Sequence, residues 1–405
     1  MIIYKKSWCL ILIAILLAGI APDVYAQSED VHVITEIEYT FADKAHFVSR
    51  ISSMDPIENV TLFTRSGSSQ DTQTITAILE RSESEITAEV SLNLDDVKWQ
   101  PFSPITYWWQ IEFEDGETTT SPPESFNYID NREFWSFLEG TQIRIHWQFG
   151  DLEFGQAVVD ISDKALDSIL DDLALPARDF VNIYIYPTVS DLQDTLQLGG
   201  SSWISGHSFD NFGVILLAAS PDSEGIVQLE RDIPHELTHA LLAQRLGASY
   251  GQLPAWLNEG LATLEEATPN NLYPAALEDA YQAHKLLPMA SLCASFPFDN
   301  DHALLAYAQS TSFAKYIKDI YGIGAFVALF DAYQEGTSCE GGVQRVFQRP
   351  LTQLEAEWID YHFSNQATLS LTSSSLLWAL PIALILFGGG YLYYRHRKGK
   401  AQLEV

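Results

Sequence analysis

The sequence has few positively charged residues for its length. It contains 22 Lys and Arg residues against 54 Asp and Glu residues in 405 positions, which gives a formal net charge of -32. A chain with this balance lacks the basic surface that binding to nucleic acid or to anionic lipid requires. We therefore expect no nucleic-acid partner, and we expect a role in solution chemistry outside the cell.

Cysteine is also scarce, with three residues in the whole chain. Neither Cys293 nor Cys339 sits in a spacing typical of metal ligands. Cys9 falls in a segment that we expect to be removed, which leaves an even pair in an oxidising compartment. This parity predicts a disulfide between Cys293 and Cys339, the alternative being two free buried thiols.

Long apolar runs are confined to the two ends of the chain. At the start, Lys5 and Lys6 precede an apolar run over residues 8–20, and residues 24–26 form an A-x-A-like site. This order is typical of a secretory signal peptide. We predict a signal peptide over residues 1–26 that is cleaved after Ala26.

The second apolar run, residues 376–394, has 19 residues and is just long enough to cross a bilayer. A Ser/Thr-rich linker over residues 367–375 precedes it, and a basic tail over residues 395–405 follows, which should stay in the cytoplasm. The alternative is a buried core helix. We expect a single-pass protein of the cell membrane whose ectodomain is extracytoplasmic. Without residues 1–26 and the segment from Ser374 on, 22 − 6 = 16 basic residues face 54 − 2 = 52 acidic ones, a net charge of -36.

Residues 27–130 alternate between apolar and polar positions. The segments ITEIEYTF, ITAILERS, ITAEVSLNL and ITYWWQIEF show this period, with turn signals at residues 66–68 and 115–116 between them. Short strands at this spacing predict an all-β antiparallel sandwich. The stretch TYWWQIEFEDGETTTSP is similar to the last strands of a fibronectin type III or immunoglobulin-like module. We interpret this domain as a spacer or a docking module.

From residue 131 the pattern predicts an α+β domain that extends to residue 366. Strand, helix, strand, helix and strand signals follow one another over residues 141–148, 152–173, 181–187, 189–196 and 213–218. After Glu266 apolar residues recur at three- and four-residue steps almost to Phe363, with Gly322 and Gly336 as helix stops. We expect an all-helical C-terminal subdomain that forms the second wall of a cleft.

Between these two parts lies the motif HELTH, which carries His235, Glu236 and His239. HExxH on a helix puts two imidazoles on one face, one turn apart, where they can hold one metal ion. Glu259 follows 20 positions after His239, in a second predicted helix opened by Pro254. Two histidines and one glutamate leave a fourth position open for water, as in a catalytic zinc site. Glu265 and Glu266 are rival third ligands at this point.

HELTH followed by WLNEGLATLEE resembles the gluzincin metallopeptidases, and WLNEG is very similar to the aminopeptidase branch of that group. The layout of residues 131–366 is similar to that of peptidase MA-like proteins. The resemblance implies a zincin-like fold and a Zn²⁺ ion held by His235, His239 and Glu259. It also places Glu266 at the acid that ends the motif in the aminopeptidase branch.

Two catalytic roles follow. Glu236 directly follows the first ligand, so its carboxylate can act as the general base that takes a proton from water and passes it to the leaving amine. Tyr307, in AYAQS, matches by context the tyrosine that stabilises the oxyanion in the gluzincins it resembles. A tyrosine on an amphipathic helix is also a common core residue, and His302, Ser310 and Tyr316 are its competitors.

The chain departs from the family pattern at Thr263, where some gluzincins carry an aspartate that orients a zinc-bound histidine. We interpret His146 and His207 as structural or surface histidines. The resemblance further implies that the last strand before the active-site helix, over residues 213–219, is the sheet edge that pairs with an extended peptide. Residues 212–220 contain no acidic residue, whereas the aminopeptidase branch has one in this region. This absence favours an endopeptidase.

Together these features predict a membrane-anchored, extracytoplasmic zinc endopeptidase that acts on a peptide or protein substrate. An aminopeptidase is the alternative within enzymes. A surface binding or adhesion protein with an inactive peptidase fold is the alternative from another class.

Overall fold

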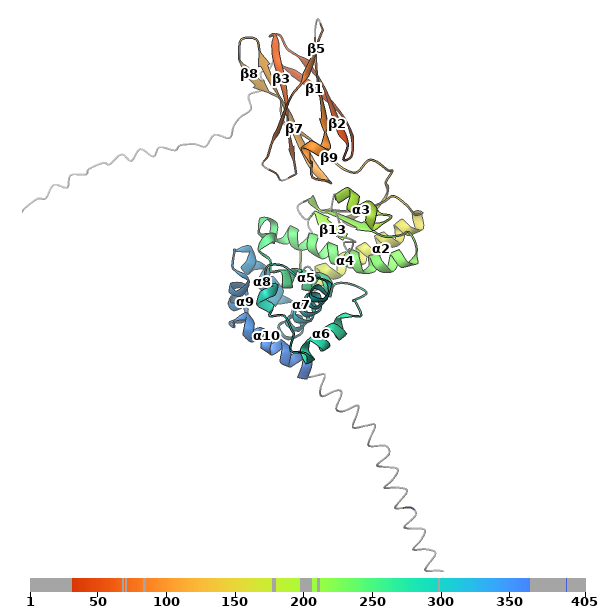
Figure 1. Cartoon of the computed structure of the whole chain (residues 1–405), viewed down its shortest axis with the longest axis vertical. Coiled ribbons are helices and arrows are strands. Elements are labelled where there is room, and N and C mark those ends of the chain that lie inside the picture. The colour runs from red at the N-terminus through yellow and green to blue at the C-terminus, as the bar shows by residue number, and fades with distance from the viewer. Residues whose placement is uncertain are drawn as a thin grey trace, which may run out of the picture. The chain divides into compact units, whose positions relative to one another are not determined.

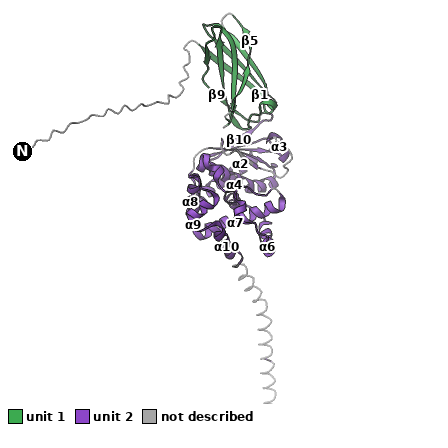
Figure 2. Ribbon diagram, turned by 60° about the vertical axis from the view of Figure 1, so that its left-hand side comes forward, with its two compact units in different colours: residues 1–131 green, residues 132–405 purple. Residues whose placement is uncertain are grey.

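The computed structural model describes residues 31–364 and Tyr391, apart from residues 68, 70, 83–84, 177–179, 197–205, 210–211 and 298. The predicted signal peptide, linker and basic tail lie outside the described residues, as does the predicted membrane span except for Tyr391. Among the helices that the structure describes, none is both long and apolar enough to cross a membrane. The chain divides into two compact units, residues 1–131 and 132–405 (Figure 2).

Unit 1 is built from two antiparallel sheets, and its only described helix is the four-residue α1 (Leu94–Val97). One sheet has the order β1-β2-β6-β5, with strands His32–Thr40, Lys44–Ser52, Ile86–Asn93 and Ile78–Arg81. The other has the order β4-β3-β7-β8, with β9 also paired to β7; these strands are Gln73–Thr76, Ile57–Ser66, Ser103–Phe113, Thr118–Thr120 and Glu124–Tyr128.

The two sheets of unit 1 share one apolar core. Burial alternates strictly along β7, as the period of a strand with one covered face requires. Phe47 from the first sheet and Leu62 and Trp109 from the second are fully buried in the same cluster. The indole N–H of Trp109 donates to the Thr35 hydroxyl across the core, 3.0 Å away. The predicted sheet-rich N-terminal region is therefore confirmed, and it has the layers of a sandwich.

Unit 2 begins with a mixed five-stranded sheet in the order β10-β11-β12-β14-β13. The strands are Ser136–Glu139, Ile143–Trp147, Val181–Tyr186, Val214–Ala218 and Gly206–Phe209. The central three run parallel, and β10 and β13 are antiparallel to their neighbours. Helices α2 (Leu152–Asp172) and α4 (Ser223–Leu246) contact the sheet, and α3 (Val189–Leu196) contacts β12 and β14.

The sheet edge differs from the sequence expectation. The strand predicted as the edge, over residues 213–219, corresponds to β14, which pairs with β12 on one side and with β13 on the other. On this side the edge strand of the described sheet is β13, whose four residues Gly-His-Ser-Phe show no apolar alternation. The prediction was wrong because so short a strand has no periodic signal of its own and forms by pairing with a buried neighbour.

The remaining described helices of unit 2 gather on the side of α4 away from the sheet (Figure 1). They are α5 (Ala255–Leu264), α6 (Tyr273–Gln282), α7 (Asn300–Tyr321), α8 (Ile323–Gln334), α9 (Cys339–Phe347) and α10 (Leu351–Ile359), with short turns η2 (Gly247–Gln252), η3 (Met289–Leu292) and η4 (Asp360–Ser364). Gly322 and Gly336 follow the ends of α7 and α8 with positive φ, as predicted. The helical C-terminal region is confirmed.

Candidate metal centre

Helix α4 holds the two histidines of HELTH on one face. Its N-terminus is capped by the Asp222 side chain, which accepts hydrogen bonds from two backbone N–H groups of the first turn. Gly247, with φ 56°, ends it. Because His235 and His239 are one turn apart, their ring centroids lie 4.9 Å from each other.

Glu259 reaches the same point from α5. Its Oε2 lies 3.6 Å from Nε2 of His235 and 3.7 Å from Nε2 of His239. One ligand atom from each of the three residues lies within 4.8 Å of the other two. The structure therefore brings together the two histidines and the glutamate that the sequence singled out, in a group that could hold a metal ion.

The second nitrogen of each histidine has its own acceptor. Nδ1 of His235 lies 3.0 Å from Oε1 of Glu266, and Nδ1 of His239 lies 3.1 Å from Oδ1 of Asn258. A carboxylate or amide oxygen can only accept here, so each Nδ1 carries a hydrogen, and each Nε2, once its own proton is lost, has a lone pair for a metal ion held together with Glu259. This is the tautomer that a metal ligand needs, so these residues fit a metal ion.

Glu266 is thus an orienting partner of His235, and the structure gives it no place among the three grouped ligands. Asn258, which the sequence analysis did not single out, does the same for His239 and is itself held by the Tyr250 hydroxyl, 3.2 Å from its Nδ2. Thr263 is buried, and no hydrogen-bond partner for its hydroxyl is found in the described part of the chain. Both orienting residues lie in the segment that starts at WLNEG. The resemblance of this segment to the gluzincins is the sequence signal that could have pointed to them.

Helix packing places Tyr307 beside Glu259. Gly260 lies where α5 crosses α7, and a Cβ on it would lie 2.6 Å from the backbone oxygen of Ser310, so only glycine allows this approach. The Tyr307 hydroxyl and the Glu259 carboxylate are close enough to shift each other's pKa, and the Tyr307 ring lies 6.4 Å from the His235 ring, centroid to centroid. The Tyr307 ring also lies edge-on to Phe296, with 4.9 Å between centroids.

The start of α5 is tied to the predicted disulfide, which is present between Cys293 and Cys339. The backbone N–H of Ala255, the first residue of α5, donates to the carbonyl oxygen of Cys293, 3.0 Å away. Cys339 begins α9, so the bridge links α9 to the segment that is hydrogen-bonded to the start of α5.

Charges in the centre are strongly coupled. Burial by itself would lower the pKa of His235, but hydrogen bonds to Glu259 and Glu266 raise it to about 10. Burial raises the pKa of Glu236, against the positive charges of His239 and His235. Burial also raises the pKa of Tyr307, with the Glu259 charge adding to it, so its phenol keeps its proton. A group of buried carboxylates of this kind attracts positive charge.

The competing residues lie in other surroundings. His302 is exposed at the start of α7 and bonds to its capping residue Asp299. Ser310 is buried at the α5–α7 crossing, and Tyr316 packs among aromatic rings. Glu265, the other rival ligand, lies at the end of α5 near Asp172 and Lys318.

Of the two histidines interpreted as structural, His146 stacks on Tyr184 with 4.2 Å between ring centroids and contacts Asn182 Oδ1. Burial lowers its pKa. This is a packed histidine of the sheet. The side chain of His207 lies outside the described residues.

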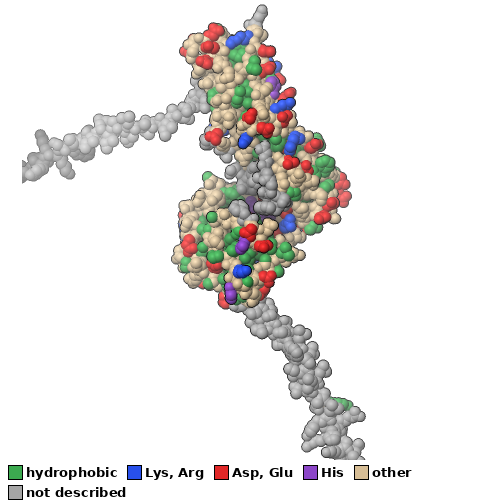
Figure 3. All heavy atoms as spheres, in the orientation of Figure 1, with side chains coloured by type: hydrophobic (Ala, Val, Ile, Leu, Met, Phe, Trp, Pro, Cys, Tyr) green, Lys and Arg blue, Asp and Glu red, His purple; other side chains and the backbone are tan. Residues whose placement is uncertain are grey.

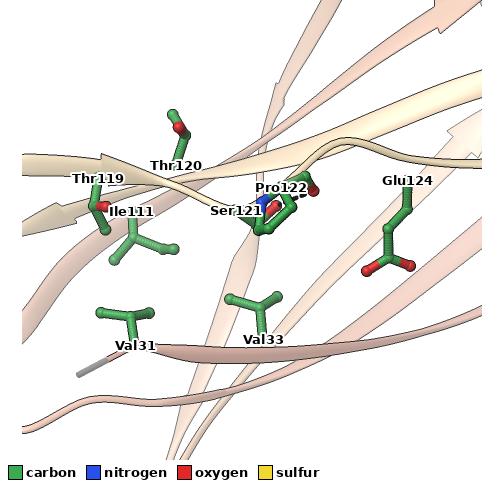
Figure 4. A pocket seen from close by; sticks show the side chains of 8 residues that line it. All are labelled: Val31, Val33, Ile111, Thr119, Thr120, Ser121, Pro122 and Glu124. Atoms are coloured by element: carbon green, nitrogen blue, oxygen red, sulfur yellow. Dashed lines mark hydrogen bonds between the residues drawn. The ribbon is translucent and has the colours of Figure 1, made fainter. Parts of the chain in front are cut away.

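Unit 1 offers a pocket of about 110 Å³ between β1, β7 and β8 (Figure 4). Its lining is apolar and hydroxyl-bearing, with one carboxylate: Val31, Val33, Ile111, Thr119, Thr120, Ser121, Pro122 and Glu124. A single carboxylate provides neither a metal site nor an acid and base pair.

Comparison with known proteins gives one match that bears on the chain's family. Residues 162–364, half of the chain, match the family model of the Peptidase MA superfamily. These residues include α4, α5 and α7, and therefore the whole candidate centre. Curated proteins gave no match.

Similarity to solved structures is weak. A structure described as a myokine shares 9% identity at a TM-score of 0.19, over 24% of this chain and 92% of that one. OgpA from Akkermansia muciniphila shares 9% identity at a TM-score of 0.21, over 26% of this chain and 30% of that one. Purple acid phosphatase PPD1 from yellow lupin shares 12% identity at 0.20, over 46% and 35%. Similarities with TM-scores this low indicate neither the fold nor the function of this chain.

Proposed function

The chain belongs to the peptidase MA superfamily, and on that premise we propose that it is a zinc-dependent peptidase with a zincin-like catalytic unit. One observation carries the proposal: the Nε2 atoms of His235 and His239 converge on Glu259 while both Nδ1 atoms are held by acceptors. Two imidazoles and one carboxylate in this arrangement suit a catalytic zinc ion.

Bound zinc supplies Lewis acidity, which makes water a stronger acid and a carbonyl carbon a stronger electrophile. Glu236 takes the proton from the attacking water and delivers it to the leaving amine. Burial favours the protonated form of its carboxyl group, which helps it hold the proton between these two events.

Tyr307 donates a hydrogen bond to the oxygen that gains negative charge in the transition state. Its phenol keeps its proton because burial and the Glu259 charge raise its pKa. Its place on α7 beside the His235 ring puts the hydroxyl at the centre before substrate arrives.

We propose endopeptidase cleavage. The outer edge of β13 is unpaired in the described sheet, and an extended peptide can add to free backbone groups of this kind. The strand's four residues, Gly206–Phe209, include no acid to bind a substrate amino terminus. β14 is paired on both sides, so the lack of an acid over residues 212–220 does not bear on this choice.

We also propose that unit 1 is a fibronectin- or immunoglobulin-like spacer or docking module and that residues 376–394 anchor the protein, with its ectodomain outside the cytoplasm. Acidic side chains spread over the visible face of both units, as Figure 3 shows, which suits a soluble ectodomain. Protease treatment of intact cells should remove both units and leave the tail. Protection of both units from the protease would contradict the proposed orientation.

The activity is tested with purified full-length protein. We expect one zinc ion per chain by mass spectrometry and chelator-sensitive cleavage of casein, lost in Glu236→Gln and kept in Glu224→Gln, an exposed residue on the same helix. The products formed from a peptide library distinguish the two modes of cleavage. Internal cleavage supports an endopeptidase, and removal of single amino-terminal residues supports an aminopeptidase. Zinc retained without any turnover leaves an inactive binding protein.

A further inference from the structure

Gly206, the first residue of edge strand β13, lies against the carboxylate of Glu236. A Cβ built on Gly206 would lie 2.7 Å from Oε1 and 3.0 Å from Cγ of Glu236, and 3.0 Å from Cδ2 of Leu217. Gly206 and Leu217 are paired in the ladder between β13 and β14, and Leu217 belongs to the core that α4 covers. The Cα–H of Gly206 therefore points to the same side as the active-site helix.

The backbone of Gly206 does not itself call for glycine. Seven described glycines have positive φ, and Gly206 is not among them. Glycine is also one of the residues that strands disfavour, because it loses the most conformational freedom on folding. The reason for glycine at this position must be its neighbours.

Of the two neighbours, Glu236 is the one that can give way. Leu217 is fully buried in the core of unit 2, where close packing resists movement of a side chain. The Glu236 carboxylate is the far end of a flexible side chain. Ordinary van der Waals contact begins near 3.4 Å, so a Cβ on Gly206 would drive Oε1 back by about 3.4 − 2.7 = 0.7 Å.

We propose that Gly206 is a positioning residue for the general base: its missing side chain leaves the room in which the Glu236 carboxylate lies at the metal centre. This inference rests on the proposed peptidase function for its catalytic consequence. Its structural part concerns the Glu236 carboxylate alone. Gly206 itself touches no reacting atom.

The test compares wild-type protein with Gly206→Ala, both as the full chain. We expect kcat to fall about 10- to 100-fold, because a displacement of this size moves the Glu236 carboxylate away from the position needed for proton transfer. The substrate KM, the zinc content and the melting temperature should stay unchanged, since no ligand moves. Gly251→Ala is the matched control, because a Cβ there meets nothing within 4 Å, and it should keep full activity.

A second pair of variants separates displacement of the base from general damage. Glu236→Asp shortens the side chain by one methylene and withdraws it from Gly206, so adding Gly206→Ala to Glu236→Asp should cost less than about threefold further. If Gly206→Ala lowers kcat by the same factor in both backgrounds, the effect does not pass through Glu236 and the inference is wrong.

Crystal structures of both proteins provide a readout that needs no turnover. In Gly206→Ala the Glu236 carboxylate should be displaced by at least about 0.5 Å while β13 stays in place. An unmoved carboxylate beside a shifted β13 would overturn the inference, even if the wild type proved inactive. Wild-type activity with an equally active Gly206→Ala variant would overturn it while leaving the peptidase function intact.

Discussion

The two units bury their polar groups in different ways. In the described part of unit 1, four of the five buried polar residues are serines or threonines, and the fifth is Asp130. In unit 2 the buried set includes Asp232, His239 and Glu266, all on or just after the two helices that form the metal centre. Burying ionisable groups costs free energy unless they are paired, so their concentration in unit 2 points to a site, whereas unit 1 resembles a stable support.

The sharpest test of this comparison removes the third ligand. Glu259→Ala should abolish zinc binding at micromolar zinc and lower peptide hydrolysis by at least about a thousandfold, because losing a single oxyanion donor already costs about 100- to 1,000-fold. Zinc content by mass spectrometry and initial rates on casein measure both effects. Full zinc content in this variant would place the ion elsewhere.

A core substitution in unit 1 should lower stability and leave catalysis unchanged. Trp109 is fully buried, so Trp109→Ala should lower the free energy of unfolding of unit 1 by about 3–5 kcal/mol and leave hydrolysis of short peptides unchanged. Urea unfolding followed by near-UV circular dichroism measures the first effect. The matched variant Trp256→Ala, at a fully buried position of α5, should impair both stability and activity. Loss of peptide hydrolysis in Trp109→Ala would contradict the assignment of catalysis to unit 2 alone.

The orienting role of Glu266 predicts a smaller effect. Glu266→Ala should weaken zinc affinity about 10- to 100-fold, since the partners of metal-bound histidines contribute by this amount, and saturating zinc should restore activity. Competition with a fluorescent chelator measures the affinity. Glu266→Gln keeps an acceptor for His235 and should lose less. Equal losses in both variants would show that charge, and not the hydrogen bond, matters.

The smallest expected effect concerns Glu265, outside the metal centre. Burial, with the nearby charge of Asp172 adding to it, raises its pKa to about 7 from a usual 4.5. The folded state therefore holds a proton that the unfolded state loses above pH 4.5, so the stability tied to this proton is full below that value and is lost as the pH rises through 7. Glu265→Gln should match wild type near pH 4.5 and be more stable by about 1–3 kcal/mol at pH 8. Urea midpoints across this range would show it, and a difference that is independent of pH would contradict it.

The local sequence pattern predicted much of the secondary structure of unit 2 correctly. The helix predicted over residues 189–196 has the same bounds as α3, and that predicted over 152–173 differs from α2 by one residue. Amphipathic periods and glycine stops are local signals, so the chain around each residue suffices to reveal them. The short strand β13 has no such signal and was missed, and with it the true edge of the sheet.

The sequence by itself determined that His235 and His239 share a helix face, because four residues make about one turn. It also predicted that Cys293 and Cys339 pair, and the structure has this disulfide. Only the tertiary structure decided that Glu266 and Asn258 orient the histidines, that Tyr307 lies near Glu259, and that Gly206 faces Glu236. These relations join segments up to 48 residues apart (307 − 259) through packed helices and a sheet edge, and no local period encodes such distances.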